Sequence, residues 1–258
     1  MKLLKETARV FLSLGAMIFP HVSGFAQETA PSTQPQVNDE VQAKKAVAPP
    51  KVERVSPGIY RIADDISLDL KKREISFPAF CNQVNGLVEY ALVHESGKTH
   101  ESLFRTKVPP RNLQASLLLA RVPAAAGFVE NLWKEDRLKM DVSASRLSII
   151  VSWRLKENEE LRSLQLVKMA TNSNSKNPIA DGSFVFSGSR FVENVFMAEE
   201  SGSIVAVYAD DTAMINSGDH DSNDDDVWIA LKDVMPPLDH PVTFTLKFPS
   251  KEVPLKKR

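Results

Sequence analysis

Short runs in which apolar and polar residues alternate, separated by turn residues, recur along this chain and constrain its fold most strongly. Residues 66–70, Ile-Ser-Leu-Asp-Leu, have the period of a half-buried strand. The turn at 71–73 joins them to 74–77, which predicts a hairpin. Residues 147–155 and 241–248 repeat the alternation. About nine short strands, joined mostly by hairpins, predict a β-rich α+β fold with antiparallel sheets.

Two further hairpins are expected around the tripeptide Glu-Ser-Gly, which occurs twice. In the first, residues 87–94 and 99–105 are antiparallel strands, and Gly97 supplies the positive φ that such a turn usually needs. In the second, residues 195–198 and 203–208 flank the tripeptide. Turn chemistry explains the shared letters more simply than an internal repeat does.

One helix is expected near residues 112–121. Asn112 follows two prolines and suits the N-cap position, while Leu113 and Leu117 have helical spacing. Pro123 then ends the helix. Residues 124–136 favour no single type of element.

The first 26 residues have the pattern of a secretory signal peptide. A basic start, with Lys2, Lys5 and Arg9, precedes an apolar run over 10–19 and small residues at 24–26. The apolar run is too short to span a bilayer. Removing this segment, whose net charge is +2, changes the total from −1 to −3. We therefore expect an exported protein, periplasmic or extracellular.

Residues 27–50 are rich in Gln, Pro, Ala, Thr and Val and contain no aromatic residue. Such a segment buries too little apolar surface to offset its ordering entropy, which predicts a disordered linker. We expect a single globular domain over 51–250 and a charged tail over 251–258. No stretch after the signal peptide is apolar enough to be transmembrane.

Charge and cysteine content exclude several classes of function. The near-zero net charge argues against nucleic acid and other polyanions as general partners. The single cysteine, Cys81, excludes an intramolecular disulfide, an iron–sulfur cluster and a Cys-rich zinc site. A lone cysteine after Phe80 is more often a small buried residue than a nucleophile. Trp133, Trp153 and Trp228 are too dispersed for a stacking platform and are expected in or beside the core.

Several segments, taken in order, resemble YdjY-type domains. They are Gly-Leu-Val-Glu-Tyr-Ala-Leu-Val-His-Glu-Ser-Gly-Lys-Thr-His-Glu-Ser-Leu (86–103), Asn-Leu-Gln-Ala-Ser-Leu-Leu-Leu-Ala (112–120), Phe-Ser-Gly-Ser (186–189), Gly-Ser-Ile-Val-Ala (202–206), Ala-Met-Ile-Asn (213–216) and Asp-Asp-Asp-Val-Trp (224–228). The resemblance covers about residues 52–248, and Lys-Thr-His-Glu-Ser-Leu is its most specific piece. It implies an exported bacterial cell-envelope protein with no assigned reaction.

His94, His100 and Glu101 are the candidate catalytic residues. Imidazole and carboxylate groups can ligate a metal or transfer protons. The expected hairpin places His94 and Glu101 diagonally on one face, whereas His100 points to the other face because neighbours on a strand alternate. The alternative is a satisfied structural hydrogen bond or an exposed polar edge, and such a structural role is the commoner one for these groups.

An acidic loop over residues 219–226 is the candidate metal site. Asp219, Asp221, Asn223 and Asp225 alternate, as oxygen ligands do in calcium loops. An EF-hand is excluded, because the positions that need Gly and Glu hold Asp224 and Ala230. A looser site for calcium or another divalent metal stays open beside the alternative of a solvated acidic loop.

Three functions remain open from the sequence. The favoured one is a non-catalytic module that binds a small ligand, a metal or another envelope protein. The second is a metal-dependent enzyme that uses His94, His100 and Glu101. The third is a purely structural envelope protein, for which no pocket with converging polar groups is expected.

Overall fold

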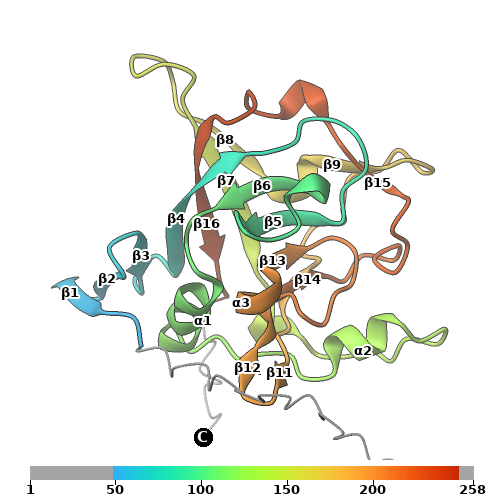
Figure 1. The fold of residues 1–258 in the computed structure, drawn as a ribbon, viewed down its shortest axis with the longest axis horizontal. Coiled ribbons are helices and arrows are strands. Elements are labelled where there is room, and N and C mark those ends of the chain that lie inside the picture. Colours follow the sequence, from blue (N-terminus) through green and yellow to red (C-terminus); the bar gives the residue numbers. More distant parts are fainter. Residues whose placement is uncertain (1–48, 250–258) are drawn as a thin grey trace, which may run out of the picture. The chain divides into compact units, whose positions relative to one another are not determined.

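The computed structural model describes residues 49–249, which belong to one compact unit (Figure 1). The predicted signal peptide, nearly all of the linker and the charged tail lie outside these residues. The described part is rich in strands, with 35% strand and 16% helix, which confirms the predicted β-rich α+β class. Among the described residues no helix has the length and apolar character that crossing a membrane requires.

The main sheet of the described part has twelve strands, ordered β1-β2-β3-β4-β6-β5-β13-β14-β10, with β16, β7 and β8 added beside β4. Their bounds are β1 (Val52–Ser56), β2 (Ile59–Ile62), β3 (Ile66–Asp69), β4 (Glu74–Cys81), β5 (Tyr90–His94), β6 (Ser102–Thr106), β7 (Ser148–Trp153), β8 (Arg162–Gln165), β10 (Phe184–Phe186), β13 (Ser203–Ala206), β14 (Ile215–Ser217) and β16 (Pro241–Lys247). Two small sheets pair β9 (Ala170–Asn172) with β15 (Trp228–Ala230), and β11 (Phe191–Val192) with β12 (Val195–Phe196).

Strand β4 organises the sheet because it pairs with three other strands. Its first half pairs with β3 in the predicted hairpin, and its end pairs with β6. Along its other edge β4 pairs with β16, which in turn pairs with β7. Alternate residues of β4, β7 and β16 are buried, as the period-two pattern predicts. The rings of Phe77 on β4 and Phe104 on β6 both pack against the ring of Phe244 on β16.

The prediction of an antiparallel hairpin over residues 87–105 is wrong. Strands β5 and β6 are parallel neighbours, with Leu92 opposite Phe104, and residues 99–101 form a 3₁₀ turn, η1. Antiparallel pairing would need a tight reversal, but here the chain runs back beside β5 before β6 begins. Gly97 does not have the positive φ that the hairpin required.

The prediction of a hairpin over residues 195–208 is also wrong. Strand β12 pairs with β11, and a short helix, α3 (Met197–Ser201), separates it from β13. Strand β13 lies between β5 and β14, antiparallel to the first and parallel to the second. Gly202 ends α3 with φ of 74°, the left-handed conformation typical of helix ends.

The predicted helix is present, but it starts two residues earlier than expected. Helix α1 spans Pro110–Leu119, with Pro109 at the N-cap and Pro110 at the first helical position, where a missing N–H costs nothing. Asn112 therefore lies inside the helix and is buried. The Glu199 side chain of α3 accepts a hydrogen bond of 3.0 Å from the Arg111 N–H, so a carboxylate caps α1 from another element.

Residues 124–136, which favour no element in the sequence, contain the short helix α2 (Phe128–Leu132). A small apolar cluster holds α2 against the fold, and its buried members are Phe128, Val129, Leu132, Val142, Val185 and Ala209. In Figure 1, α2 and the β1–β3 strands lie at opposite sides of the view. Three further 3₁₀ turns are η2 (Ser143–Ser145), η3 (Leu166–Lys168) and η4 (Lys232–Val234).

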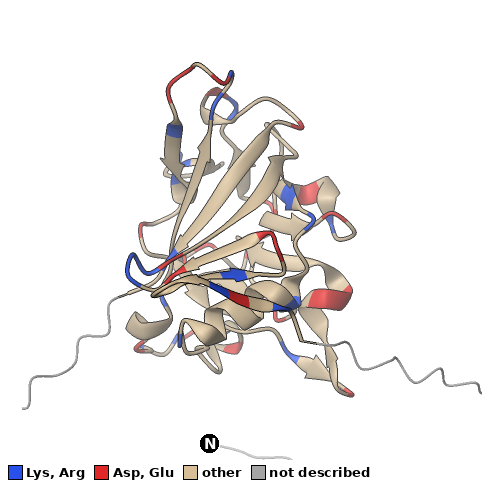
Figure 2. Ribbon diagram, turned by 90° about the vertical axis from the view of Figure 1, so that its left-hand side faces the viewer, with Lys and Arg blue, Asp and Glu red and all other residues tan. Residues whose placement is uncertain are grey.

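Basic and acidic residues are interspersed over the described fold (Figure 2). This distribution agrees with the near-zero net charge of the whole chain. The local exceptions therefore matter more than the total, and one of them surrounds the candidate site.

Candidate ligand-binding site

A surface hollow of about 270 Å³ lies beside α2, and we call it the α2 hollow. Three segments line it: residues 89–98 around β5, helix α2 with its C-cap, and the connection between β13 and β14. The lining residues are Glu89, Tyr90, Lys98, Val129, Glu130, Trp133, Tyr208, Ala209, Asp210 and Asp211. A second hollow of about 250 Å³ adjoins it and shares Val129, Glu130 and Asp211.

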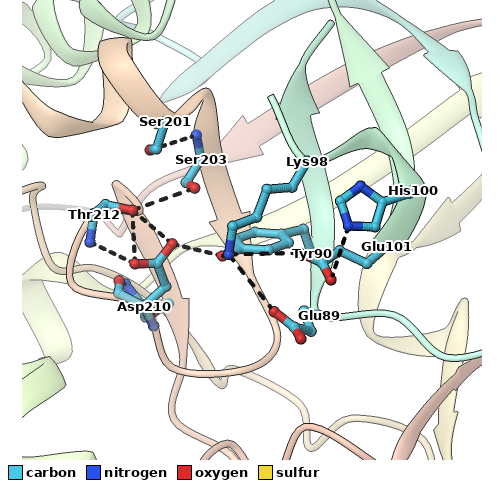
Figure 3. A network of polar contacts seen from close by, with 10 residues as sticks. Glu89, Tyr90, Lys98, His100, Glu101, Ser201, Ser203, Asp210 and Thr212 are labelled. Carbon is cyan, nitrogen blue, oxygen red and sulfur yellow. Dashed lines mark hydrogen bonds and ion pairs between the residues drawn. The ribbon is translucent and has the colours of Figure 1, made fainter. Parts of the chain in front are cut away.

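The base of the α2 hollow is a hydrogen-bonded network centred on Tyr90 (Figure 3). Tyr90 is buried, and its hydroxyl donates to Asp210 Oδ2 at 2.8 Å. The Lys98 ammonium donates to the same hydroxyl at 2.9 Å. Thr212 donates to Asp210 from both its N–H and its hydroxyl, each at 2.8 Å. The buried Asn216 side chain fixes the backbone of Asp210 by accepting its N–H.

The Lys98 ammonium lies among carboxylates, above an aromatic ring. Its Nζ atom is 3.6 Å from Glu101 Oε1, 4.0 Å from Glu89 Oε2 and 5.0 Å from the centroid of the Tyr90 ring. This is the arrangement in which a cation is stabilised by both charge and the negative face of a ring. The site therefore already holds one ammonium group, supplied by the chain itself.

Carboxylates outnumber cationic groups among the described residues that line the hollow. Burial is the largest cause of the raised pKa of Glu89, and the charge of the neighbouring Glu101 raises this pKa further. The charge of Lys98 lowers it, while Asp225 and Asp210 add smaller increases. Burial raises the pKa of Tyr208, and the charges of Asp225, Glu89 and Asp224 raise it again. Carboxylates from three parts of the chain therefore act on this one surface.

Tyr90 cannot serve as a base in this setting. Burial raises the pKa of its hydroxyl, and Asp210 raises it further by charge and by accepting its proton in a hydrogen bond. A hydrogen bond with Ser203 lowers the pKa of Tyr90, but burial and Asp210 outweigh it. Tyr90 therefore remains a neutral donor that joins the β5 strand to Asp210.

The walls of the hollow are aromatic. Trp133, the C-cap residue of α2, keeps 49% of its surface exposed. It contacts Tyr208 edge to face, with ring centroids 5.4 Å apart and an angle of 89° between the rings. Trp153 and Trp228 are buried in the core, as expected, whereas Trp133 is half-exposed.

A family model for the YdjY domain matches residues 66–247. The chain belongs to the YdjY domain family. The match includes every residue that lines the α2 hollow, so the hollow is a feature of the YdjY domain in this chain. No curated protein and no solved structure matches the chain.

The YdjY domain arranges the candidate catalytic residues differently from the expected hairpin. His94 contacts Ser96, with Nδ1 and Oγ 2.7 Å apart. His100 Nε2 is 3.6 Å from Glu101 Oε2, although a strand would have placed them on opposite faces. The 3₁₀ turn η1 explains the difference, because its residues do not alternate between two faces. The structure therefore brings Glu101 together with His100 and Lys98.

The acidic loop is held by hydrogen bonds to other segments as well as by bonds within the loop. Asp219 accepts the N–H groups of Ala180 and Asp221, and Asp221 accepts from the Asn172 side chain at 2.7 Å. Asn223 and Asp225 are exposed. Within residues 49–249, no three His, Cys, Asp or Glu side chains come together in a way that could hold a metal ion. A calcium site on this loop stays a prediction from the sequence.

Cys81 is fully buried, and its thiol donates to the carbonyl of Pro236 at 3.2 Å. Burial raises the pKa of the thiol to about 11; the charge of Asp239 adds to this, and that of Arg105 opposes it. The thiolate needed for nucleophilic attack is therefore disfavoured, in agreement with a structural residue.

Sequence reasoning did not single out Tyr90, Lys98, Tyr208 or Asp210 as site residues. Tyr90 and Asp210 are 120 positions apart, and no local pattern joins them. The one available signal was Trp133, which precedes the charged run Lys-Glu-Asp-Arg over 134–137 and so lies in an unusually polar context for a core residue.

Proposed function

We propose that this YdjY domain is an exported, non-catalytic binding module of the cell envelope and that the α2 hollow is its ligand site. The observation that carries the proposal is the pairing of a rigid polar base with exposed aromatic walls. Ligand sites typically combine apolar and aromatic surface with a few fixed polar groups. Export is inferred from the signal-peptide pattern in the first 26 residues.

The polar base favours binding over catalysis. Burial and Asp210 keep its central hydroxyl protonated, and its carboxylates are engaged by Tyr90, Thr212 and Lys98. Groups that already satisfy one another hold their positions without transferring protons, which suits a site that orients a ligand. Exposed Trp133 supports the same function, because large aromatic side chains provide much contact area at small entropic cost.

Chemical-shift mapping of the isotope-labelled chain with mixtures of neutral, cationic and anionic small compounds tests this proposal. We expect saturable shifts at Glu130, Trp133 and Tyr208 with at least one mixture. Trp133→Ala should abolish them, whereas Leu238→Ala, which removes an exposed leucine outside the hollow, should not. Shifts confined to other surfaces, or catalytic turnover of a compound, would contradict the proposal.

A further inference from the structure

The α2 hollow has the charge and ring content that suit a positively charged ligand. Among the residues that the structure describes, four carboxylates line it, from Glu89, Glu130, Asp210 and Asp211, against one cation, Lys98. Arg190 neutralises Asp211 from outside the hollow, with 3.1 Å between Nη1 and Oδ2. Asp210 is bonded to Tyr90 and Thr212. Lys98 offsets the charge of Glu89. Glu130 is therefore the remaining lining carboxylate whose charge partner has to be identified.

Glu130 lies on the first turn of α2 with its side chain exposed. Within the part of the chain that the structure describes, it forms no ion pair. It lines the same hollow as Trp133, three residues further along α2, and so on the same side of the helix. An unpaired carboxylate beside an exposed aromatic side chain is suited to a group that is charged on one side and apolar on the other.

The chain itself shows what this surface accepts. Lys98 places its ammonium 5.0 Å from the centroid of the Tyr90 ring and within 4.0 Å of two carboxylates. Trp133, Tyr208 and Glu130 line the same hollow and so bring a carboxylate and two touching aromatic rings to one surface. Burial raises the pKa values of Glu89 and Tyr208, and neighbouring carboxylates raise both further.

We infer that the α2 hollow binds a small organic ammonium ion, with the charged nitrogen near Glu130 and the alkyl groups against Trp133 and Tyr208. The inference rests on the proposed function and specifies its ligand class. Anionic ligands are disfavoured, because they would meet the carboxylates of Glu89 and Glu130 that line the hollow. Neutral ligands would forfeit both the ion pair and the cation–π contact.

Choline and 3,3-dimethylbutan-1-ol are the matched probes, because they have the same shape and differ in the charge of one atom. Calorimetric titration of the purified protein at low ionic strength should show choline binding at least about tenfold tighter than the alcohol. Glu130→Gln should weaken choline about two- to fivefold and leave the alcohol unchanged. Trp133→Leu, which keeps an apolar wall without a π face, should weaken choline more than the alcohol.

Two variants complete the design. Glu135→Gln removes a carboxylate that is exposed and close in sequence but does not line the hollow, so choline affinity should stay unchanged. Lys98→Gln removes the internal cation, so choline affinity should rise about two- to fivefold. A gain of affinity cannot come from a variant that merely fails to fold.

The outcomes separate the ligand class from the proposed function. Equal affinity for choline and the alcohol, with both lost in Trp133→Ala, would overturn the ammonium inference and leave a ligand site in the hollow. Equal loss of choline binding in Glu130→Gln and Glu135→Gln would also overturn it. Absence of choline binding overturns it as well, and the mapping experiment with other compounds then decides whether the hollow is a binding site at all.

Discussion

Gly97 and Gly202 pack directly against each other, and each closes one of the two Glu-Ser-Gly tripeptides. A Cβ atom on Gly97 would lie 2.8 Å from the Ser201 carbonyl oxygen, and one on Gly202 would lie 2.7 Å from the Gly97 Cα atom. The tripeptides are therefore two sides of one backbone contact between the β5–β6 connection and the end of α3. Lys98, the residue after Gly97, donates a hydrogen bond to the Tyr90 hydroxyl.

We expect Gly97→Ala to destabilise the domain by about 1–3 kcal/mol, because the new methyl group overlaps backbone atoms that cannot move away cheaply. Gly202→Ala should cost more than Gly127→Ala, since both have positive φ but only Gly202 also meets a clash. Denaturant unfolding measures both effects. The double variant Gly97→Ala/Gly202→Ala should be less destabilised than the sum of the single changes, and strict additivity would argue against the contact.

The bond between Tyr90 and Asp210 should contribute measurably to stability. Tyr90→Phe removes the hydroxyl that serves both Asp210 and Lys98, so we expect a loss of about 1–2 kcal/mol. A double-mutant cycle with Asp210→Asn should give a coupling energy of about 1 kcal/mol. Tyr60→Phe, on a half-buried tyrosine outside the network, is the matched control. Equal effects of the two tyrosine changes would refute the role given to the network.

The pH dependence of stability should show the titration of Cys81. The folded-state pKa of about 11 exceeds the ordinary value of 9.0, so the stabilisation is complete below pH 9 and is lost as the pH rises through 11. The loss should amount to about 2–3 kcal/mol over this window. Cys81→Ala should remove this component from the curve of unfolding free energy against pH, whereas tyrosine titration remains in both proteins.

The reactivity of Cys81 provides an independent check of the same residue. At pH 8 we expect slow modification of the native protein by a thiol reagent and fast modification in denaturant, because the thiol is buried and bonded to the Pro236 carbonyl. Rapid labelling of the native protein would show that Cys81 is accessible.

The cap that Glu199 forms on α1 should depend on its charge. Glu199→Gln keeps the size of the side chain but loses the favourable interaction with the helix N-terminus, so we expect a loss of about 0.3–1 kcal/mol. Glu157→Gln, on an exposed glutamate away from α1, should change stability by less than that. Thermal unfolding compares the two, and a larger effect of Glu157→Gln would contradict the cap.

The sequence predicted those elements whose burial depends on the local pattern alone. The alternation in β3, β7 and β16 identifies strands because one face of each packs against the core. The prediction of hairpins failed over residues 87–105 and 195–208, because Gly97 and Gly202 have the sequence context of turn glycines. Gly97 in fact serves a close backbone approach, which only the partner segment explains.

The site was less predictable than the fold. Strands β5 and β13 are far apart in the chain but are neighbours in the sheet. This pairing brings Tyr90 and Lys98 close to Asp210. Trp133 lies at the hollow because the cluster around Phe128 and Ala209 places α2 there, and residues 124–136 have no clear periodicity. His94 and Glu101, paired in the expected hairpin, are separated by the parallel arrangement of β5 and β6.

The most direct test of the ligand site is a nuclear Overhauser measurement on the labelled protein with choline. We expect contacts from the trimethylammonium protons to the Trp133 indole and the Tyr208 ring, the two aromatic walls of the α2 hollow. Contacts only to side chains outside the hollow, or none at saturating choline, would contradict ammonium binding at this site.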